Sequence, residues 1–282
     1  MKFGTTLRAS KIEDIIARVE MMSQTGIPED QRCYELVVLG NDLENTGLIV
    51  ENVNRFGLMI ESVHSPFTSA NPREFGKYSL ATPKGRASFL EAARLTQAVG
   101  AHKLVVHSGT YWIGHPSASN YPIIRRNTIE TLTMAAQFGV LPCLENVPWP
   151  LFGGAAQDVL ATHFVDLALE IAAEAGVGFC LDTAHLLTVE NDINTLSQTL
   201  AGCITHAHLS NMQFVEGGFH EGLPIDGKGN FDESYVSWLL EMMPNNAAVI
   251  LEIWDHDMRD LRESRQSFDW LVPWLKPKYI AA

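Results

Sequence analysis

The sequence has few basic residues and no long apolar run. Its 20 Lys and Arg residues are outnumbered by 33 Asp and Glu residues, which gives a formal net charge of -13 at pH 7. Because nonspecific binding to nucleic acids depends on neutralising phosphates with basic groups, this charge argues against a broad nucleic-acid-binding surface. No apolar segment approaches the ~20 residues that span a membrane, so we expect a soluble protein without a membrane partner.

Cysteine is also scarce. The four cysteines, Cys33, Cys143, Cys180 and Cys203, are widely spaced and form no Cys-x-x-Cys pair. Cys143 and Cys180 lie in predicted buried strands and Cys33 directly precedes one; in such strands cysteine usually behaves as a small hydrophobic residue. Residues 1–10 lack the apolar stretch of a secretory signal. These features predict a cytoplasmic protein, and nothing suggests the lowered thiol pKa of a nucleophile at Cys143 or Cys180.

Residue types that bind metals recur at a nearly constant distance from residues that stop helices. In six places a Gly or Asn is followed six or seven residues later by a His, Asp or Glu, across a short apolar run rich in β-forming residues. The pairs are Gly57 with His64, Gly100 with His107, Gly139 with Glu145, Gly176 with Asp182, Gly202 with His208, and Asn246 with Glu252. Each interval therefore predicts a buried strand that ends in a polar side chain.

The same periodicity predicts eight alternating strands and helices. The expected strands cover residues 2–7, 34–40, 58–64, 103–107, 141–145, 178–182, 205–209 and 248–254. A helix is expected from Gln157 to Ala175, because its apolar residues form one stripe. Two polar stretches, residues 65–82 and 211–230, are expected to be long loops after strand ends.

Alternating strands and helices indicate parallel strands, and eight of them suffice to close a barrel. An open, doubly wound sheet is the alternative. We favour closure because only a barrel brings the ends of the third to eighth strands around one centre. The predicted fold class is therefore α/β, a single (β/α)8 TIM barrel, with residues 1–282 forming one domain.

Four residues at strand ends form a candidate metal site: Glu145, Asp182, His208 and Glu252. Side chains alternate along a strand, so the residue two positions earlier can fill the barrel below each of them. A buried carboxylate costs several kcal/mol unless it is paired or bound to metal, and three at one barrel mouth need a cation. An oxygen-rich set with one nitrogen suits Mn²⁺, Mg²⁺ or Co²⁺ and also accommodates Zn²⁺.

Other polar and aromatic residues near the strand ends have more than one interpretation. His64 and His107 are either hydrogen-bonded barrel histidines or ligands of a second metal ion that shares Glu145. His206 is expected to pack inside the barrel. His185, at the turn from strand to loop, is expected to contact substrate or metal.

Three aromatic residues are expected just beyond strand ends. Phe67, Trp149 and Trp254 either form walls of a substrate pocket or belong to the core.

These residues lie in motifs that resemble those of xylose isomerase-like barrels, in the same order along nearly the whole chain. The motifs are His64-Ser-Pro-Phe with Asn71 downstream, Val106-His107-Ser-Gly109, Leu144-Glu145-Asn146, Leu181-Asp182-Thr-Ala-His185, His208-Leu-Ser-Asn211, Gly227-Lys-Gly229 and Leu251-Glu252. The superfamily contains sugar and sugar-phosphate isomerases and epimerases, related dehydratases, and the endonuclease IV branch. One metal scaffold serves all these reactions, so the motifs specify the superfamily better than the reaction.

The resemblance implies a metal-dependent isomerase or epimerase that acts on a small sugar, keto sugar or sugar phosphate through an enediolate. By this resemblance Glu145, Asp182, His208 and Glu252 hold the ion. Glu145 and Glu252 also exchange the proton, and His185 orients a substrate hydroxyl.

Two alternatives stay open. An endonuclease IV-like phosphodiesterase would use His64 and His107, which match positions of an additional zinc in those enzymes. The segment from His220 to Gly227 lacks the Asp-x-His element that completes a third zinc site there, which argues against cleavage of abasic DNA. The other alternative is a noncatalytic barrel that binds a ligand without metal. The sequence leaves the substrate, the number and identity of the metal ions, and the oligomeric state open.

Overall fold

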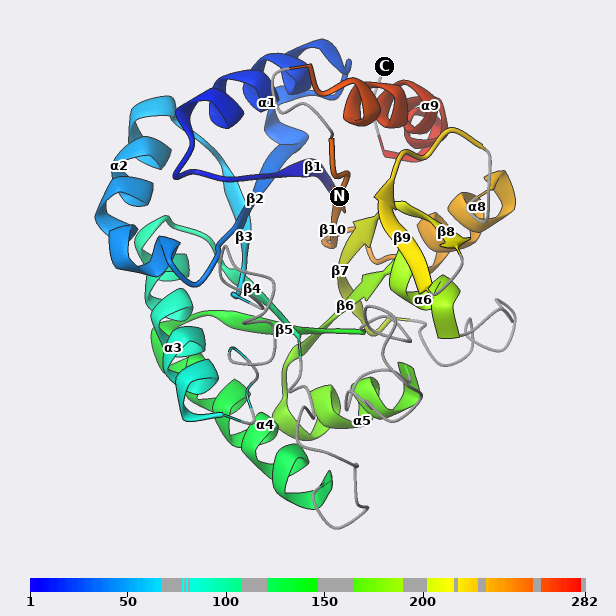
Figure 1. Cartoon of the computed structure of the whole chain (residues 1–282). Coiled ribbons are helices and arrows are strands. Elements are labelled where there is room, and N and C mark those ends of the chain that lie inside the picture. Colours follow the sequence, from blue (N-terminus) through cyan, green and yellow to red (C-terminus); the bar gives the residue numbers. More distant parts are fainter. Residues whose placement is uncertain are drawn as a thin grey trace.

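The computed structural model describes residues 1–66, 78, 80, 82–107, 121–146, 165–189, 202–215, 218–227, 232–255 and 260–279. Eight parallel strands form a closed barrel in the order β1-β10-β7-β6-β5-β4-β3-β2, so the predicted (β/α)8 fold class is confirmed. Figure 1 looks along the barrel, with helices around it. The strands are β1 (Lys2–Leu7), β2 (Arg32–Val37), β3 (Ile60–His64), β4 (Lys103–His107), β5 (Leu141–Glu145), β6 (Gly178–Asp182), β7 (Ile204–Leu209) and β10 (Ala248–Leu251).

Helices cover the outside of the barrel. The α-helices are α1 (Ile12–Gln24), α2 (Thr46–Phe56), α3 (Pro83–Ala98), α4 (Tyr121–Ala135), α5 (Val165–Ala175), α6 (Thr183–Val189), α8 (Glu233–Met242) and α9 (Arg262–Tyr279). Short 3-10 turns are η1 (Glu29–Gln31), η2 (Asp42–Asn45) and η4 (Ala136–Phe138). Within the described residues, no helix combines the length and the apolar character needed to cross a membrane.

Glycines end several helices as the sequence predicts. Gly57, with φ 59°, caps α2 in the left-handed region, which a residue without Cβ adopts at little cost. The prediction that Asn246 ends a helix in the same way was wrong, because Asn246 lies beyond the end of α8 and its φ is not positive. Leu261 is the one described non-glycine residue with positive φ. Helix α8 ends instead at Met242, and the extended backbone of its C-cap residue Met243 (ψ 131°) reflects the restriction that Pro244 places on its predecessor.

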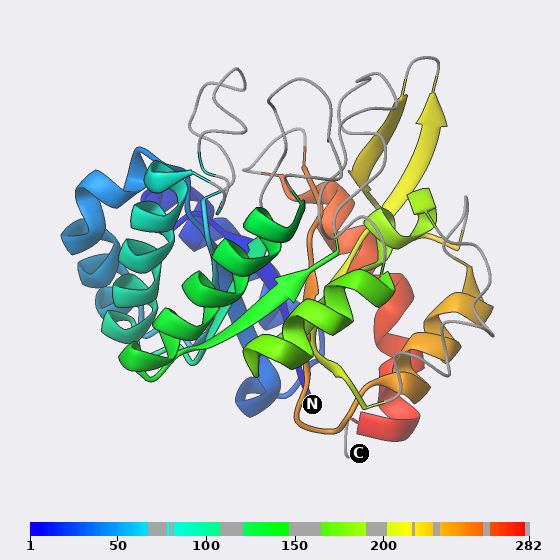
Figure 2. The same cartoon turned by 90° about the horizontal axis from the view of Figure 1, so that it is seen from below.

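A hairpin, β8 (Asn211–Val215) and β9 (Gly218–Leu223), lies where residues 211–230 were expected to form a loop. Figure 2 shows it at one end of the barrel, with the N-terminus at the other. The last barrel strand is also shorter than predicted, ending at Leu251. Trp254 N–H donates to Gly222 of β9 at 2.9 Å.

Two further predictions fall partly outside the described residues. These are the first half of the helix expected from Gln157 and most of the loop expected over residues 65–82.

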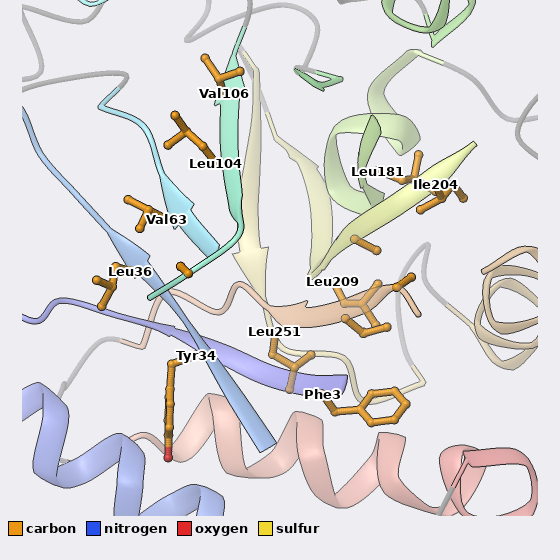
Figure 3. Packing of buried hydrophobic residues seen from close by; sticks show 14 of the residues in the cluster. Phe3, Tyr34, Leu36, Val63, Leu104, Val106, Leu181, Ile204, Leu209 and Leu251 are labelled. Atoms are coloured by element: carbon orange, nitrogen blue, oxygen red, sulfur yellow. The ribbon is translucent and has the colours of Figure 1, made fainter. Parts of the chain in front are cut away.

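The hydrophobic core has two separate parts. The larger part lies between strands and helices, and Figure 3 shows Phe3 and Tyr34 pointing toward the helical layer. The smaller part consists of Val105, Cys143 and Cys180, which are buried together. The register aligns Val105 with Cys143, and each of the three side chains lies two residues before the end of its strand. This small cluster therefore lies inside the barrel, below the polar strand ends.

A buried arginine ties the end of β10 to two helices. The Arg18 guanidinium of α1 donates to Thr5 at 2.8 Å and to Asp255 at 3.2 Å, and it also pairs with Asp14 at 3.3 Å. Asp255 in turn accepts from the backbone N–H of Ser264 in α9 at 3.0 Å. Because Asp255 lies three residues after Glu252, this network fixes the segment that carries Glu252.

We expect Arg18→Ala to lower the free energy of unfolding by about 3–5 kcal/mol, because it removes the ion-pair partner of two buried carboxylates. Urea unfolding followed by circular dichroism measures this change. Arg126→Ala is the matched control. Arg126 and Glu130 are exposed and 3.9 Å apart, so the control should cost about 1 kcal/mol or less. Equal effects of the two variants would contradict the buried network.

Candidate metal centre

Six polar side chains meet at the carboxyl ends of the barrel strands. The register places His107 beside Glu145 and Asp182 beside His208, so neighbouring strands present them at the same height. The six are His64 at the end of β3, His107 at the end of β4, Glu145 at the end of β5, Asp182 at the end of β6, His208 near the end of β7, and Glu252 directly after β10.

The structure brings the four predicted metal residues together. Glu145, Asp182, His208 and Glu252 each offer one atom within 4.8 Å of the others. His208 Nδ1 lies 3.0 Å from both Glu145 Oε1 and Glu252 Oε2, and 3.9 Å from Asp182 Oδ2. Three of the four are fully buried, whereas the Glu252 side chain is 16% exposed.

This arrangement fits a divalent cation. The site has three carboxylates, Glu145, Asp182 and Glu252. Within the described part of the chain they form ion pairs with histidines, and no Lys or Arg pairs with them. Donor atoms 3.0–3.9 Å apart can each lie ~2.0–2.3 Å from one central ion. Three carboxylates and one imidazole are ligands that Mn²⁺, Mg²⁺ or Co²⁺ accept readily and that Zn²⁺ also tolerates.

A second cluster shares Glu145. His64 Nε2 lies 3.1 Å and His107 Nε2 lies 2.9 Å from Glu145 Oε2, while Glu145 Oε1 faces His208. His64 Nδ1 lies 2.9 Å from the Ser65 carbonyl, which places a proton on Nδ1. Nε2 of His64 is therefore the nitrogen that can bind a metal or donate to Glu145. Both interpretations of these two histidines fit the geometry.

The histidines and carboxylates shift one another's pKa in opposite directions. Burial raises the pKa of Glu145, but His107 and His208 outweigh it and hold the pKa well below its usual range. Burial lowers the pKa of His64, yet Glu145 raises it to about 9. Asp182 behaves differently: burial and the nearby Glu145 raise its pKa to about 7. The metal-free site therefore holds protons that a cation would displace.

His185 lies in a helix rather than at the start of a loop, because α6 begins directly after β6. Asp182 Oδ1 accepts from the His185 backbone N–H at 2.7 Å and so caps this helix. His185 Nδ1 lies 2.8 Å from the Asn146 carbonyl, and Nε2 lies 3.2 Å from Glu221 Oε2. Sequence reasoning missed Glu221, because its place on β9 depends on the unpredicted hairpin.

Glu35 is a second residue that sequence reasoning missed. It lies in β2 and is completely buried, with Oε2 2.9 Å from Nε2 of His206. Ser62 donates to the same oxygen at 2.7 Å. His206 is fully buried, as predicted. A glutamate in the otherwise apolar run from Cys33 to Leu39 was the available signal, but it does not end the strand as the candidate ligands do.

Comparison with known proteins identifies the family. The profile described as "Xylose isomerase-like TIM barrel" matches residues 33–274. The chain belongs to this family. No curated protein matches the chain in sequence.

Solved structures share the fold of this xylose isomerase-like barrel at low sequence identity. D-allulose 3-epimerase from Methylomonas sp., in complex with D-allulose, is 14% identical with a TM-score of 0.69, covering 99% of this chain and 97% of that chain. 3-keto-D-glucoside 4-epimerase from E. coli is 16% identical with a TM-score of 0.63, and the match covers 98% of this chain and 99% of that chain. Endonuclease IV from Thermus thermophilus is 17% identical with a TM-score of 0.61, and the match covers 97% of this chain and 100% of that chain.

The predicted aromatic residues have different outcomes in this xylose isomerase-like barrel. Trp149 and Phe67 lie outside the described residues. Trp254 is 51% exposed, and it packs against Gly222, where an added Cβ would come within 2.5 Å of the indole. With φ +69° Gly222 also needs the left-handed region. Trp254 is thus held at the base of the β8–β9 hairpin.

We expect the dependence of metal affinity on pH to steepen below about pH 7. The raised pKa of Asp182, about 7, means that this carboxyl is ionised above that pH and must release a proton to bind metal below it. One displaced proton weakens binding about tenfold per pH unit in that range. Titration of metal-free protein with Mn²⁺ over a series of pH values measures the slope. Asp182→Asn should bind more weakly and lose this steepening; an unchanged slope would contradict the assignment.

Proposed function

We propose that the protein is a divalent-metal-dependent isomerase or epimerase acting on a small sugar, keto sugar or sugar phosphate. The observation that carries this proposal is the placement of two glutamates. Glu145 from β5 and Glu252 after β10 come from different sides of the barrel, and each lies 3.0 Å from His208 Nδ1. Two carboxylates that flank one point can remove a proton from one face of a carbon and return it to the other.

The chemistry needs both the ion and the protein side chains. A divalent ion at this site supplies Lewis acidity, which lowers the cost of removing a proton beside a carbonyl. Asp182 and His208 would hold the ion. Glu252 is more open to the barrel mouth than the fully buried Glu145, so it is placed to meet a substrate from outside. Positioned proton transfer of this kind contributes about 10²–10⁴-fold to the rate.

Further residues would bind the substrate. His185 lies beside Asp182 and Glu221, and we assign it to a substrate hydroxyl. Trp254, at the base of the hairpin, offers an indole face of the kind that packs against sugars. The structural likeness to D-allulose 3-epimerase and 3-keto-D-glucoside 4-epimerase supports a sugar as the substrate class. The family membership supports an enzyme of this group.

Phosphoester hydrolysis is the second candidate function. The observation in its favour is the second cluster of His64, His107 and Glu145, together with the likeness to endonuclease IV. Two ions ~3.5–4 Å apart are typical of such hydrolysis. Elemental analysis of protein purified without added metal separates the candidates. One tightly bound ion favours the isomerase, two favour the phosphodiesterase, and none favours a noncatalytic barrel.

Glu252→Gln should lower turnover more than it lowers metal occupancy. Glutamine keeps an oxygen near the ion but cannot act as the base. Incubation with candidate keto sugars in D₂O reports the step directly, as deuterium entry at the carbon beside the carbonyl. His208→Ala is the matched variant, and it should lose metal and exchange together.

Three results would count against this assignment. Exchange that survives unchanged in Glu252→Gln would remove Glu252 from proton transfer. Full exchange by metal-free protein would show that the chemistry does not depend on the ion. Failure of every keto and phosphorylated sugar to exchange would favour the other two functions.

We expect neither cleavage of abasic DNA nor salt-sensitive binding to duplex DNA. The net charge of -13 opposes phosphate contacts, which weaken steeply as salt rises. The segment before Gly227 also lacks an Asp-x-His element. A nicking assay on an abasic duplex, with and without added Mn²⁺ or Zn²⁺, tests this expectation. Metal-dependent nicking that disappears in Asp182→Asn would promote the phosphodiesterase instead.

A further inference from the structure

Glu35 is a buried carboxylate that the proposed reaction does not use. It lies inside the barrel on β2, where the register places it beside Ser62 of β3. Its Oε2 atom accepts from the Ser62 hydroxyl at 2.7 Å and lies 2.9 Å from Nε2 of His206. Burying an ionised carboxylate costs several kcal/mol unless neighbouring groups compensate its charge.

The other oxygen of Glu35 faces a proposed metal ligand. Glu35 Oε1 lies 2.9 Å from Nε2 of His208, although the angles fall short of a hydrogen bond. Neither of these two buried atoms has a hydrogen-bond partner elsewhere in the described part of the chain. On the opposite side of the imidazole, Nδ1 lies 3.0 Å from both Glu145 and Glu252. The ring of His208 thus separates Glu35 from the metal centre.

We propose that Glu35 is a positioning residue that fixes His208 with its Nε2–H toward Glu35 and its Nδ1 lone pair toward the ion. This inference rests on the proposed metal centre. A metal-bound histidine commonly donates its other ring N–H to a carboxylate, which sets the tautomer and orients the ring. Glu35 is the carboxylate next to Nε2, whereas the carboxylates of Glu145 and Glu252 face Nδ1 and would be ligands themselves.

His206 and Ser62 hold Glu35 in the orientation that this role requires. Both contact Oε2, so Oε1 is left for His208. His206 Nδ1 is buried with no hydrogen-bond partner among the described residues, which is the state expected when the ring proton is on Nε2 toward Glu35. The rings of His206 and His208 are 5.3 Å apart at an angle of 81°, so the same carboxylate can serve both.

Metal affinity in Glu35→Gln is the first test, measured with Zn²⁺ against a competing chelator. Loss of a carboxylate behind a metal-bound histidine commonly weakens metal binding by about 10–100-fold, and we expect a loss in this range. Glu61→Gln is the matched control. Glu61 is also a barrel glutamate, but it pairs with Lys2 and Lys103, each at 2.8 Å, at the other end of the strands. The control should change the affinity by less than about threefold on the same scale.

Which His208 nitrogen binds zinc and which carries the proton is a second measurement, and a general loss of stability would not change it. In long-range ¹H–¹⁵N spectra of the zinc-loaded wild type, His208 should bind zinc through Nδ1 and carry its proton on Nε2. Ser62→Ala removes one hydrogen bond from Glu35 but keeps its charge, and it should weaken zinc binding less than Glu35→Gln. Zinc on Nε2 in the wild type would overturn the proposal even if Glu35→Gln does not fold. Unchanged zinc affinity in a folded Glu35→Gln would also overturn it.

The same spectra separate this inference from the proposed function. If the wild type binds no Zn²⁺ or Mn²⁺, the proposed metal-dependent function fails. The metal-free spectra then decide on Glu35. Loss of the His208 Nε2–H signal in Glu35→Ala would support its positioning role, and a signal unchanged in that variant would refute it.

Discussion

The burial of negative charge inside the barrel is the constraint on which the rest of the structure depends. Glu35, Glu145 and Asp182 are almost completely buried, and Glu252 is nearly so. Each such carboxylate costs several kcal/mol unless its charge is compensated. Among the described residues, histidines provide that compensation. A histidine can release its proton when a cation arrives, which a lysine or arginine at the same place would not do as readily.

A closed barrel suits this arrangement because it holds polar groups without letting them relax. The cluster of Val105, Cys143 and Cys180 lies inside the barrel below the strand ends, and the pKa of Cys143 is raised to about 11 by burial, so its thiol stays neutral there. Further down, Glu61 pairs with Lys103. The level of the cysteine cluster is mixed, because Glu35 and His206 lie at the same depth in the barrel. Glu145 and Asp182 at the mouth are held by strands, which move less than loops, and this rigidity favours preorganised ligands.

The sequence predicts the barrel and the strand-end residues well because both follow from regular spacing. A helix end, a short apolar run and a polar residue recur, and closure forces those polar residues to one end. Glu35 escaped this reasoning because it lies two residues before the end of β2, at a deeper level that spacing does not mark. The hairpin that carries Glu221 was not predicted, because a polar, glycine-containing segment is equally compatible with a loop. The prediction that Asn246 ends a helix was wrong because the helix already ends before Pro244.

Glu145 connects the two halves of the site. Its Oε1 atom faces His208 and Glu252 across the proposed ion, while its Oε2 atom contacts His64 and His107. Any change in the second cluster, such as protonation of a histidine or binding of another cation, therefore alters the charge on a ligand of the first. The same carboxylate is also one of the two proposed proton-transfer groups. His107 and His208 hold the pKa of Glu145 well below its usual range, so the state of the second cluster affects how basic this carboxylate is under both interpretations of its histidines.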